Sequence, residues 1–214
     1  MRTNDEPGGQ TFTERARRTQ IVGCAIELVA EAGYPAASIG KIAERAGVAK
    51  SVVLYYFSTK EKLVHTLVME IFLASVPVMV PAIAAEETAS GKLRAYIRSN
   101  GEFIHTHRDH ALAMLEIWTS YRSATGQRLD EEMAESTARQ PPQGDLAALD
   151  PTTIFELGQR TGEFRAFPVH HMTTALRQAI DGAVLQSSRD AGFDVPGYCE
   201  ELVTIFDLAT KGEP

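Results

Sequence analysis

Cysteine is scarce in this chain, and its scarcity excludes two classes of protein. The 214 residues contain two cysteines, Cys24 and Cys199, which lie far apart and match no metal-binding spacing. A disulfide framework or a structural zinc site is therefore not expected. We expect both cysteines to be reduced thiols in a cytoplasmic protein. A chain of this length can bury a substantial core without such cross-links.

A long hydrophobic run is also missing. The most apolar stretch, residues 71–85 (IFLASVPVMVPAIAA), has 15 residues and two prolines, short of the ~18–20 apolar residues that a membrane span needs. The first ten residues (MRTNDEPGGQ) are polar and lack the apolar segment of a signal peptide. We therefore expect no membrane partner and a cytoplasmic location. We also expect Pro77 to kink or break a buried helix here.

Catalytic and metal-binding motifs are lacking as well. His105 and His107 are two residues apart, which on a helix places them on different faces. Neither of these histidines, nor His110 or the pair His170 and His171, has an acidic or cysteine partner at ligand spacing. No nucleophile motif appears, and Cys24 falls on the apolar side of its helix. We expect no catalytic residue, no metal and no cofactor.

Acidic residues are less frequent in the N-terminal part of the chain than in the remainder. The net charge is −7, yet residues 1–64 carry nine Lys or Arg against seven Asp or Glu, while the remainder carries twelve against twenty-one. A slightly basic front on an acidic body is typical of a DNA-binding head attached to a body with another role.

Strand-like runs are rare, and the hydrophobic periodicity is helical almost throughout. It predicts an all-α fold of about nine helices and no sheet. Possible capping boxes are 11–14 and 58–61, Ser38 can cap a short second helix, and 138–150 (ARQPPQGDLAALD) is expected to be a loop. The helices are expected at about 11–32, 38–46, 50–57, 59–85, 92–106, 109–125, 152–161, 169–190 and 196–211.

The segment 47–63 (GVAKSVVLYYFSTKEKL) is unusual because its middle has the β-branched and aromatic composition of a strand. On a helix, however, its residues separate into an inner and an outer face at 100° per residue. Val52 and Tyr56 fall on the flanks. The inner face has Ala49, Val53 and Phe57, and the outer face has Lys50, Ser51, Leu54 and Tyr55.

The surroundings of this segment favour the helix. A short capped helix, a turn at 46–48 and a second short helix make a helix-turn-helix unit at about 38–57. The second helix of such a unit enters the major groove of DNA, where base edges are exposed. An outer face of cation, hydroxyl and large rings suits thymine methyls, sugars and phosphates.

Residues 33–63 (GYPAASIGKIAERAGVAKSVVLYYFSTKEKL) resemble the signature of TetR-family transcriptional regulators. The shared features are a Gly-aromatic pair, a small hydroxyl residue, Ile-Ala-x-x-Ala-Gly-Val, an aromatic run and Lys-Glu-x-Leu. Segments 155–165 and 179–185 are also similar to family phrases. The resemblance implies a three-helix DNA-binding domain at 1–58 and a helical effector-binding and dimerisation domain at 59–214.

The resemblance also implies roles for individual residues. Ser38 caps the second helix and Lys41 lies where that helix crosses the DNA backbone. Lys50 and Ser51 face base edges. The other implied contacts are Val52 and Leu54 in the groove, Tyr55 and Tyr56 at phosphate, sugar or base, and Lys60 at a phosphate.

Three positions of the segment 47–63 depart from the family pattern. Ala49 stands where a capping serine is frequent, a loss of ~1 kcal/mol. Val52 replaces a common small or hydroxyl residue, and Leu54 replaces a frequent tyrosine. Readout of the operator is therefore expected to depend more on Lys50, Tyr55 and methyl contacts.

For the body, the resemblance implies an effector pocket and a two-fold homodimer through a four-helix bundle. The large side chains on the middle helices are the pocket candidates. They are Phe103, His107, Met114, Trp118, Tyr121, Arg122 and Phe155. The dimer candidates on the last two helices are Leu176, Ile180, Ala183, Val184, Leu202, Ile205 and Phe206.

The expected function is a repressor that binds a near-palindromic double-stranded operator as a homodimer and is released by a small-molecule effector. Two alternatives stay open. One is an activator or a ligand-independent DNA-binding protein of the same fold, for which no effector would weaken DNA binding. The other is a helical enzyme or small-molecule carrier, whose turnover or ligand binding would not depend on Lys50, Tyr55 and Tyr56.

Overall fold

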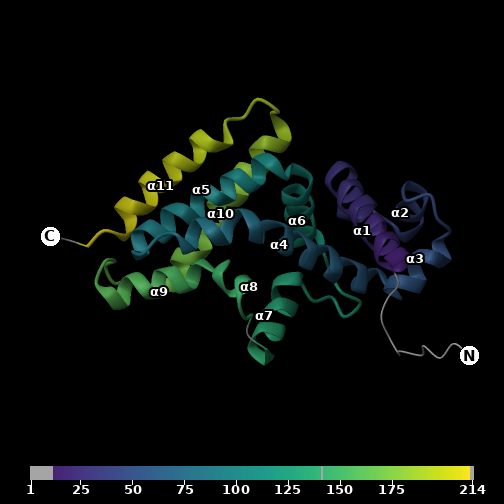
Figure 1. Ribbon diagram of the computed structural model, residues 1–214, viewed down its shortest axis with the longest axis horizontal. Coiled ribbons are helices and arrows are strands. Elements are labelled where there is room, and N and C mark those ends of the chain that lie inside the picture. The colour runs from purple at the N-terminus through teal and green to yellow at the C-terminus, as the bar shows by residue number, and fades with distance from the viewer. Residues whose placement is uncertain (1–11, 141, 213–214) are drawn as a thin grey trace, which may run out of the picture.

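The computed structural model describes residues 12–140 and 142–212, which form an elongated assembly of helices with no strand in those ranges (Figure 1). The all-α prediction is confirmed. The first half contains α1 (Phe12–Ala32), the 3₁₀ helix η1 (Tyr34–Ala36), α2 (Ile39–Arg45), α3 (Lys50–Phe57), α4 (Lys60–Ala84), α5 (Ala89–Thr106) and α6 (Arg108–Ser120). The second half contains α7 (Leu129–Arg139), α8 (Asp145–Ala148), α9 (Pro151–Thr161), α10 (Val169–Arg189) and α11 (Val195–Thr210).

The expected number of about nine helices is too low, because the described residues contain 11 α-helices. The two helices that the sequence pattern did not predict are α7 and α8. Leu129 is the one buried residue of α7, so this helix has almost no apolar periodicity. Helix α8 is a single four-residue turn inside the stretch expected to be a loop.

Helices α1 to α3 form a head that packs around one apolar core (Figure 1, right). Ile21, Ala25 and Val29 recur on the buried face of α1 at the spacing of an amphipathic helix. Val53 and Phe57 of α3 enter the same core. The expected capping box of α1 includes Thr11, which lies outside the described residues.

Two turns of the head have the backbone geometry that glycine permits. Gly33 ends α1 with φ 79° and Gly47 forms the turn between α2 and α3 with φ 63°. Ser38 caps α2, since its hydroxyl accepts a hydrogen bond of 3.3 Å from the backbone N–H of Lys41. These features confirm the predicted helix-turn-helix geometry.

Helix α4 runs without interruption through Pro77 and Pro81, so the predicted break at Pro77 is wrong. Pro77 and Leu73 are both exposed. The carbonyl of Leu73, which loses its partner to the proline, therefore lies on the solvent side of the helix, where water can bind it. The cap is also one residue later than expected, because Thr59 rather than Ser58 accepts the Lys62 N–H, at 3.1 Å.

By length and composition α4 is the one helix of the described residues that could cross a membrane. Its packing is that of a central core helix, because eight of its side chains are buried, from Leu63 near its start to Ile83 near its end. It passes from the head into the body, where α5 lies along it (Figure 1).

A second apolar core fills the body and is built from α5, α9, α10, α11 and the end of α4. Helix α6 joins the two cores. Ala113, Ile117 and the adjoining Tyr121 pack into the head core, whereas Ala111 packs into the body core. A displacement of α6 would therefore alter the packing of both the head core and the body core.

Gly158 of α9 provides a test of how tightly the body is packed. A Cβ atom at this position would lie 2.1 Å from the Phe164 ring, while a Cβ at Gly23 of α1 would meet nothing within 4 Å. We expect Gly158→Ala to lower the free energy of unfolding by about 1–3 kcal/mol through overpacking. Gly23→Ala, the matched control, should raise it by about 0.5–1 kcal/mol through helix propensity. Urea denaturation measures both, and equal effects would contradict the packing described here.

Candidate nucleic-acid interface

Helix α3 carries the side chains predicted to meet DNA, and two buried residues fix its orientation. Val53 and Phe57 are almost fully buried in the head core. Lys50, Ser51 and Tyr55 are exposed on the opposite side, and Val52 and Tyr56 are partly buried at the flanks. The predicted division of this helix into an inner and an outer face is confirmed, but Ala49 is itself exposed.

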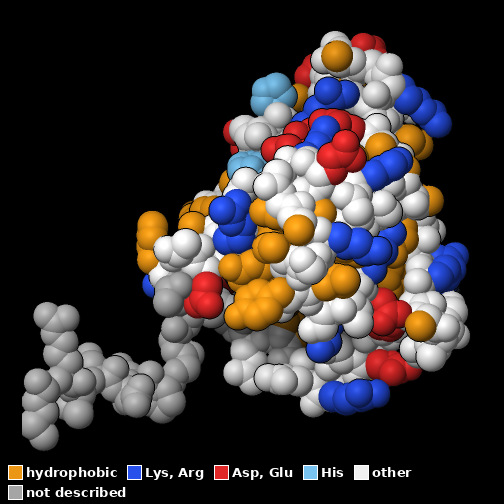
Figure 2. Space-filling model, turned by 90° about the vertical axis from the view of Figure 1, so that its right-hand side faces the viewer, with side chains coloured by type: hydrophobic (Ala, Val, Ile, Leu, Met, Phe, Trp, Pro, Cys, Tyr) orange, Lys and Arg blue, Asp and Glu red, His pale blue; other side chains and the backbone are white. Residues whose placement is uncertain are grey.

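The outer face of α3 is apolar for a solvent-exposed helix. Tyr55 is 73% exposed and Leu54 38% exposed. The ring of Tyr55 makes an edge-to-face contact with Tyr56, with 5.2 Å between the ring centroids. Figure 2 views this end of the molecule, where apolar side chains on the surface lie among lysine and arginine side chains.

The start of α3 lacks a side-chain cap, as predicted. Ala49 has extended backbone angles, φ −70° and ψ 149°, and makes no side-chain hydrogen bond to the helix. The first N–H groups of α3 therefore have no side-chain acceptor at the N-cap. On the neighbouring helix, Lys41 is exposed one turn after the Ser38 cap.

Lys60 lies at the first position of α4, directly behind α3, and is partly buried. Its Nζ lies 4.2 Å from the centroid of the Tyr34 ring, within the range of a cation–π contact. Burial lowers the pKa of this ammonium from its ordinary value. In the free protein the side chain expected to bind a phosphate is thus held against the 3₁₀ helix η1.

The three arginines in the first two turns of α1 differ in their contacts. Arg17 donates to Gln20 at 2.8 Å, and Arg18 lies over the Phe57 ring and donates to Thr66 at 3.3 Å. Arg18 therefore ties α1 to α3 and α4. Arg15 is exposed on the same helix.

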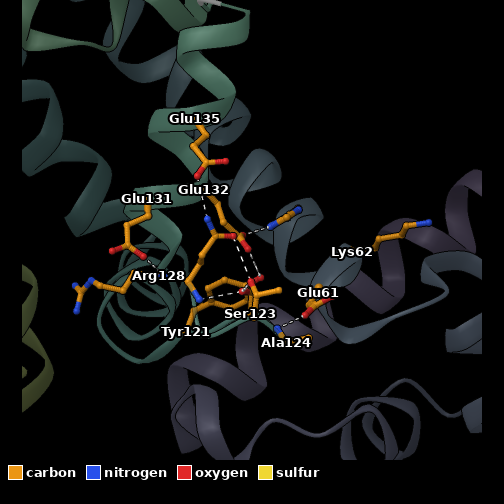
Figure 3. A network of polar contacts seen from close by, with 12 residues as sticks. Glu61, Lys62, Tyr121, Ser123, Ala124, Arg128, Glu131, Glu132 and Glu135 are labelled. Atoms are coloured by element: carbon orange, nitrogen blue, oxygen red, sulfur yellow. Dashed lines mark hydrogen bonds and ion pairs between the residues drawn. The ribbon is translucent and has the colours of Figure 1, made fainter.

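A polar network connects α4 to the segment that follows α6 (Figure 3). The Glu61 carboxylate accepts the backbone N–H of Ala124 at 2.6 Å. One turn later, the His65 ring contacts Glu132 of α7 at 2.9 Å, and Glu132 also accepts the hydroxyl of Tyr121 at 3.1 Å. Since α3 and α4 are separated by two residues, these contacts attach the body directly behind α3.

Tyr121 is the central residue of this network. Its side chain is fully buried, and its ring centroid lies 5.9 Å from that of Tyr34 in the head. Burial, and after it the nearby Glu132 carboxylate, raises the pKa of Tyr121 above its ordinary value. The hydroxyl therefore stays protonated at physiological pH and donates a hydrogen bond to Glu132.

The seven predicted pocket residues are divided between the two cores and the surface, and they stay a prediction. Phe103 and Tyr121 are buried in the head core, whereas Phe155 is buried in the body core. Met114 and Trp118 are partly buried against the head core, and Arg122 is exposed, donating to the carbonyl of Tyr121 at 2.5 Å.

His107 belongs to a small ring cluster with Phe103 and His110. The rings of Phe103 and His107 are stacked at 4.8 Å, and those of His107 and His110 meet edge to face at 5.7 Å. Burial, and after it the charge of His107, lowers the pKa of His110. Within residues 12–140 and 142–212, no three His, Cys, Asp or Glu side chains are grouped so that they could hold a metal ion.

Most of the predicted dimer residues pack into the core of their own chain, and their role in a dimer stays a prediction. Ile205 is the exception, at 53% exposed. Gly182 and Ala183 do permit close helix approach, but the neighbour at Gly182 is Tyr198 of α11 in the same chain. The residues buried in the body core are Leu176, Ile180, Ala183, Val184, Leu202 and Phe206.

A different set of side chains on α10 and α11 is available to a partner. Leu208 is 70% exposed and lies one turn after Ile205 on α11. Leu185 of α10 is 40% exposed. The sequence alone does not distinguish these exposed leucines from the buried ones, because the buried face of each helix is known only from the structure.

The head and its helix-turn-helix match a known family model. Residues 21–67 match the model described as bacterial regulatory proteins of the tetR family. The match includes all of residues 33–63, so the resemblance of this segment to TetR-family regulators is confirmed.

Curated relatives are similar to this chain over about half of its length. The fatty acid metabolism regulator protein of Bacillus subtilis is 33% identical over 102 residues, which is 48% of this chain and 52% of the relative. The HTH-type transcriptional regulator BetI of Escherichia coli is 29% identical over 106 residues, 49% of this chain and 54% of the relative. The chain thus spans about half the length of the curated relatives it matches.

Solved structures share the fold over most of the chain. FadR from Bacillus subtilis, in complex with stearoyl-CoA, has a TM-score of 0.69 at 24% identity and covers 87% of this chain and 96% of its own. A TetR-family regulator from Marinobacter aquaeolei has a TM-score of 0.73 at 16% identity, covering 94% and 98%. At these identities the likeness shows the fold alone.

Proposed function

We propose that this protein is a sequence-specific DNA-binding transcriptional regulator, a repressor that is released from its operator by a small-molecule effector. The observation that carries the proposal is the outer face of α3, where Lys50, Ser51 and Tyr55 are exposed while Val53 and Phe57 anchor the helix. In this proposal residues 1–58 form the DNA-binding domain and 59–214 the effector-binding and dimerisation domain. DNA binding places the protein in the cytoplasm.

Each exposed group on this face has a suitable partner in the major groove. The Lys50 ammonium donates to guanine acceptors, and the Ser51 hydroxyl can donate or accept at a base edge. Leu54 and Val52 offer apolar contact to thymine methyls. Tyr55 and Tyr56 reach phosphate or sugar, and Lys41 supplies a cation where α2 crosses the backbone.

Lys60 contributes to phosphate binding from behind α3. Its ammonium rests on the Tyr34 ring in the free protein, 4.2 Å from the ring centroid. A phosphate near the start of α4 meets both this cation and the first-turn N–H groups that the Thr59 cap does not use. Contacts of this type orient the head on the duplex and make the affinity strongly dependent on salt.

A homodimer places two such heads on one operator. The exposed apolar side chains Ile205 and Leu208, about one turn apart on α11, support a partner surface on this helix. A two-fold dimer sets two recognition helices about one DNA turn apart, roughly 34–36 Å, which requires a near-palindromic operator.

We expect the double substitution Ile205→Asp and Leu208→Asp to convert the dimer to a monomer, because two charges would have to be buried in an apolar interface. Sedimentation equilibrium measures the mass. The matched control is Leu73→Asp on α4, a leucine of similar exposure (49%) outside α10 and α11. A dimer that persists in the α11 variant, or one that is lost equally in the control, would contradict this interface.

An effector acts by favouring a conformation whose head spacing does not fit DNA. Helix α4 supports this role because it runs from the recognition helix into the body and exposes Met69 and Leu73, apolar surface that an effector can cover. One structural neighbour contains stearoyl-CoA. An amphipathic effector with an apolar chain suits the exposed side of α4.

The proposal is tested by electrophoretic mobility shift with an operator selected from random duplexes. The wild-type protein should bind it as a dimer, and a screen of small molecules, acyl-CoA thioesters included, should find one that releases it. Binding that no compound affects would favour the ligand-independent alternative. Turnover of a compound with no DNA binding would favour an enzyme.

A further inference from the structure

We propose that a groove between the head and the body binds a small organic cation with an apolar body. The groove has a volume of about 530 Å³ and is distinct from the outer face of α3. One wall is the end of α1 with η1, and the other is formed by α6 and the last turn of α10. A cavity of this size is within the range that accommodates small-molecule ligands.

The walls of the groove combine apolar side chains with polar groups. Leu112 and Leu115 of α6 and Leu185 of α10 supply the body side. The head side consists of Glu31 and small residues between 30 and 36, among them Pro35. Leu185 is 40% exposed, so a ligand in the groove would remove apolar surface from water.

The charged groups of the groove are carboxylates. Glu31 and Glu116 line it, and none of the twelve lining residues is Lys, Arg or His. Glu31 is paired with Arg45. For Glu116, no ion pair is found within the described ranges 12–140 and 142–212, and its recorded hydrogen bond is a long one of 3.4 Å from the Tyr34 N–H.

Glu116 is placed to meet a ligand at the corner where α1 ends. Its Oε2 lies 3.2 Å from the position that a Cβ of Gly33 would occupy, so the absence of a side chain at Gly33 leaves room for the carboxylate. The residue is partly buried, which weakens the screening of its charge by water. An ammonium group beside Glu116, with its apolar part against the leucines, matches both features of the groove.

A ligand in this groove would touch the head and the body at once. Residues 30–36 belong to the head, whereas α6 and α10 belong to the body. Its binding would therefore favour one relative position of the two parts. The binding claim is independent of the proposed function, while an effect on DNA affinity rests on it.

Three probes with one carbon skeleton and different charge test the site: 4-phenylbutylamine, 4-phenylbutan-1-ol and 4-phenylbutanoate at pH 7. Titrations are followed by the methyl NMR signals of the full-length protein labelled at leucine. We expect the amine to shift Leu112, Leu115 and Leu185 and to bind about ten-fold tighter than the alcohol, since a charge-assisted hydrogen bond adds roughly this factor. The acid should bind weakest.

Glu116→Gln removes the charge and keeps an oxygen that accepts the Tyr34 N–H. This variant should bind the amine and the alcohol equally, while Glu87→Gln, an exposed carboxylate outside the groove, should behave as wild type. The inference is overturned if the three probes bind alike, if the shifts map to other leucines, or if Glu116→Gln keeps the preference for the amine. Release of operator DNA by the amine is a separate measurement, so binding without release would refute only the link to the proposed function.

Discussion

Replacing Lys50 and Tyr55 together by alanine should lower operator affinity at least about a hundred-fold without unfolding the protein. Both side chains are exposed, so their removal leaves the core of the head intact. Each contact to a base or phosphate contributes about 1.4 kcal/mol or more, a factor of ten in the dissociation constant. Mobility shift or fluorescence anisotropy at fixed salt measures the loss.

The matched control for this experiment is Lys211→Ala, which removes an exposed cation at the far end of the body. It should leave the affinity within about two-fold of wild type, because its distance from α3 exceeds the Debye length of about 8–10 Å. Circular dichroism and sedimentation must show the double variant folded and in its normal assembly. An affinity unchanged in the double variant would mean that α3 is not the DNA-reading helix.

Substituting Tyr121 by alanine should reduce the free energy of unfolding by about 3–5 kcal/mol. The side chain is fully buried, its ring packs against Tyr34, and its hydroxyl donates to Glu132. Its removal leaves a cavity between head and body and removes one of the polar contacts that hold α7. Urea denaturation measures the change.

Tyr121→Phe separates the hydrogen bond from the packing. Phenylalanine keeps the ring but leaves Glu132 without this donor, so a loss of only about 1 kcal/mol is expected. Hydrogen exchange of α7 should accelerate in both variants, because Leu129 is the one buried residue that α7 contributes. Equal stability of the alanine variant and wild type would contradict the central position assigned to Tyr121.

The recognition helix was predictable because two independent signals agree there. The inner face of Val53 and Phe57 recurs at helical spacing, and Ser38 marks the start of the preceding helix. The missing cap at Ala49 was predictable too, because alanine has no side-chain acceptor. Such features are local, and their physical cause lies within a few residues of the chain.

The body was less predictable, because its features depend on contacts between residues distant in sequence. Helix α7 is held by Glu132 contacts to His65 and Tyr121, which no periodicity reveals. The prolines of α4 are tolerated because Pro77 lies on the exposed side, and exposure is a property of the tertiary structure. The sequence of an apolar stripe such as that of α10 does not indicate whether the stripe packs against its own chain or against a partner.

The central claim, that this protein reads DNA sequence as a dimer, is tested most directly by selecting bound duplexes from a random library at two salt concentrations. We predict a recovered palindrome with half-sites about one helical turn apart and an affinity that falls steeply as salt rises. Recovery of unrelated sequences at both salt concentrations, with no half-site symmetry, would contradict the claim.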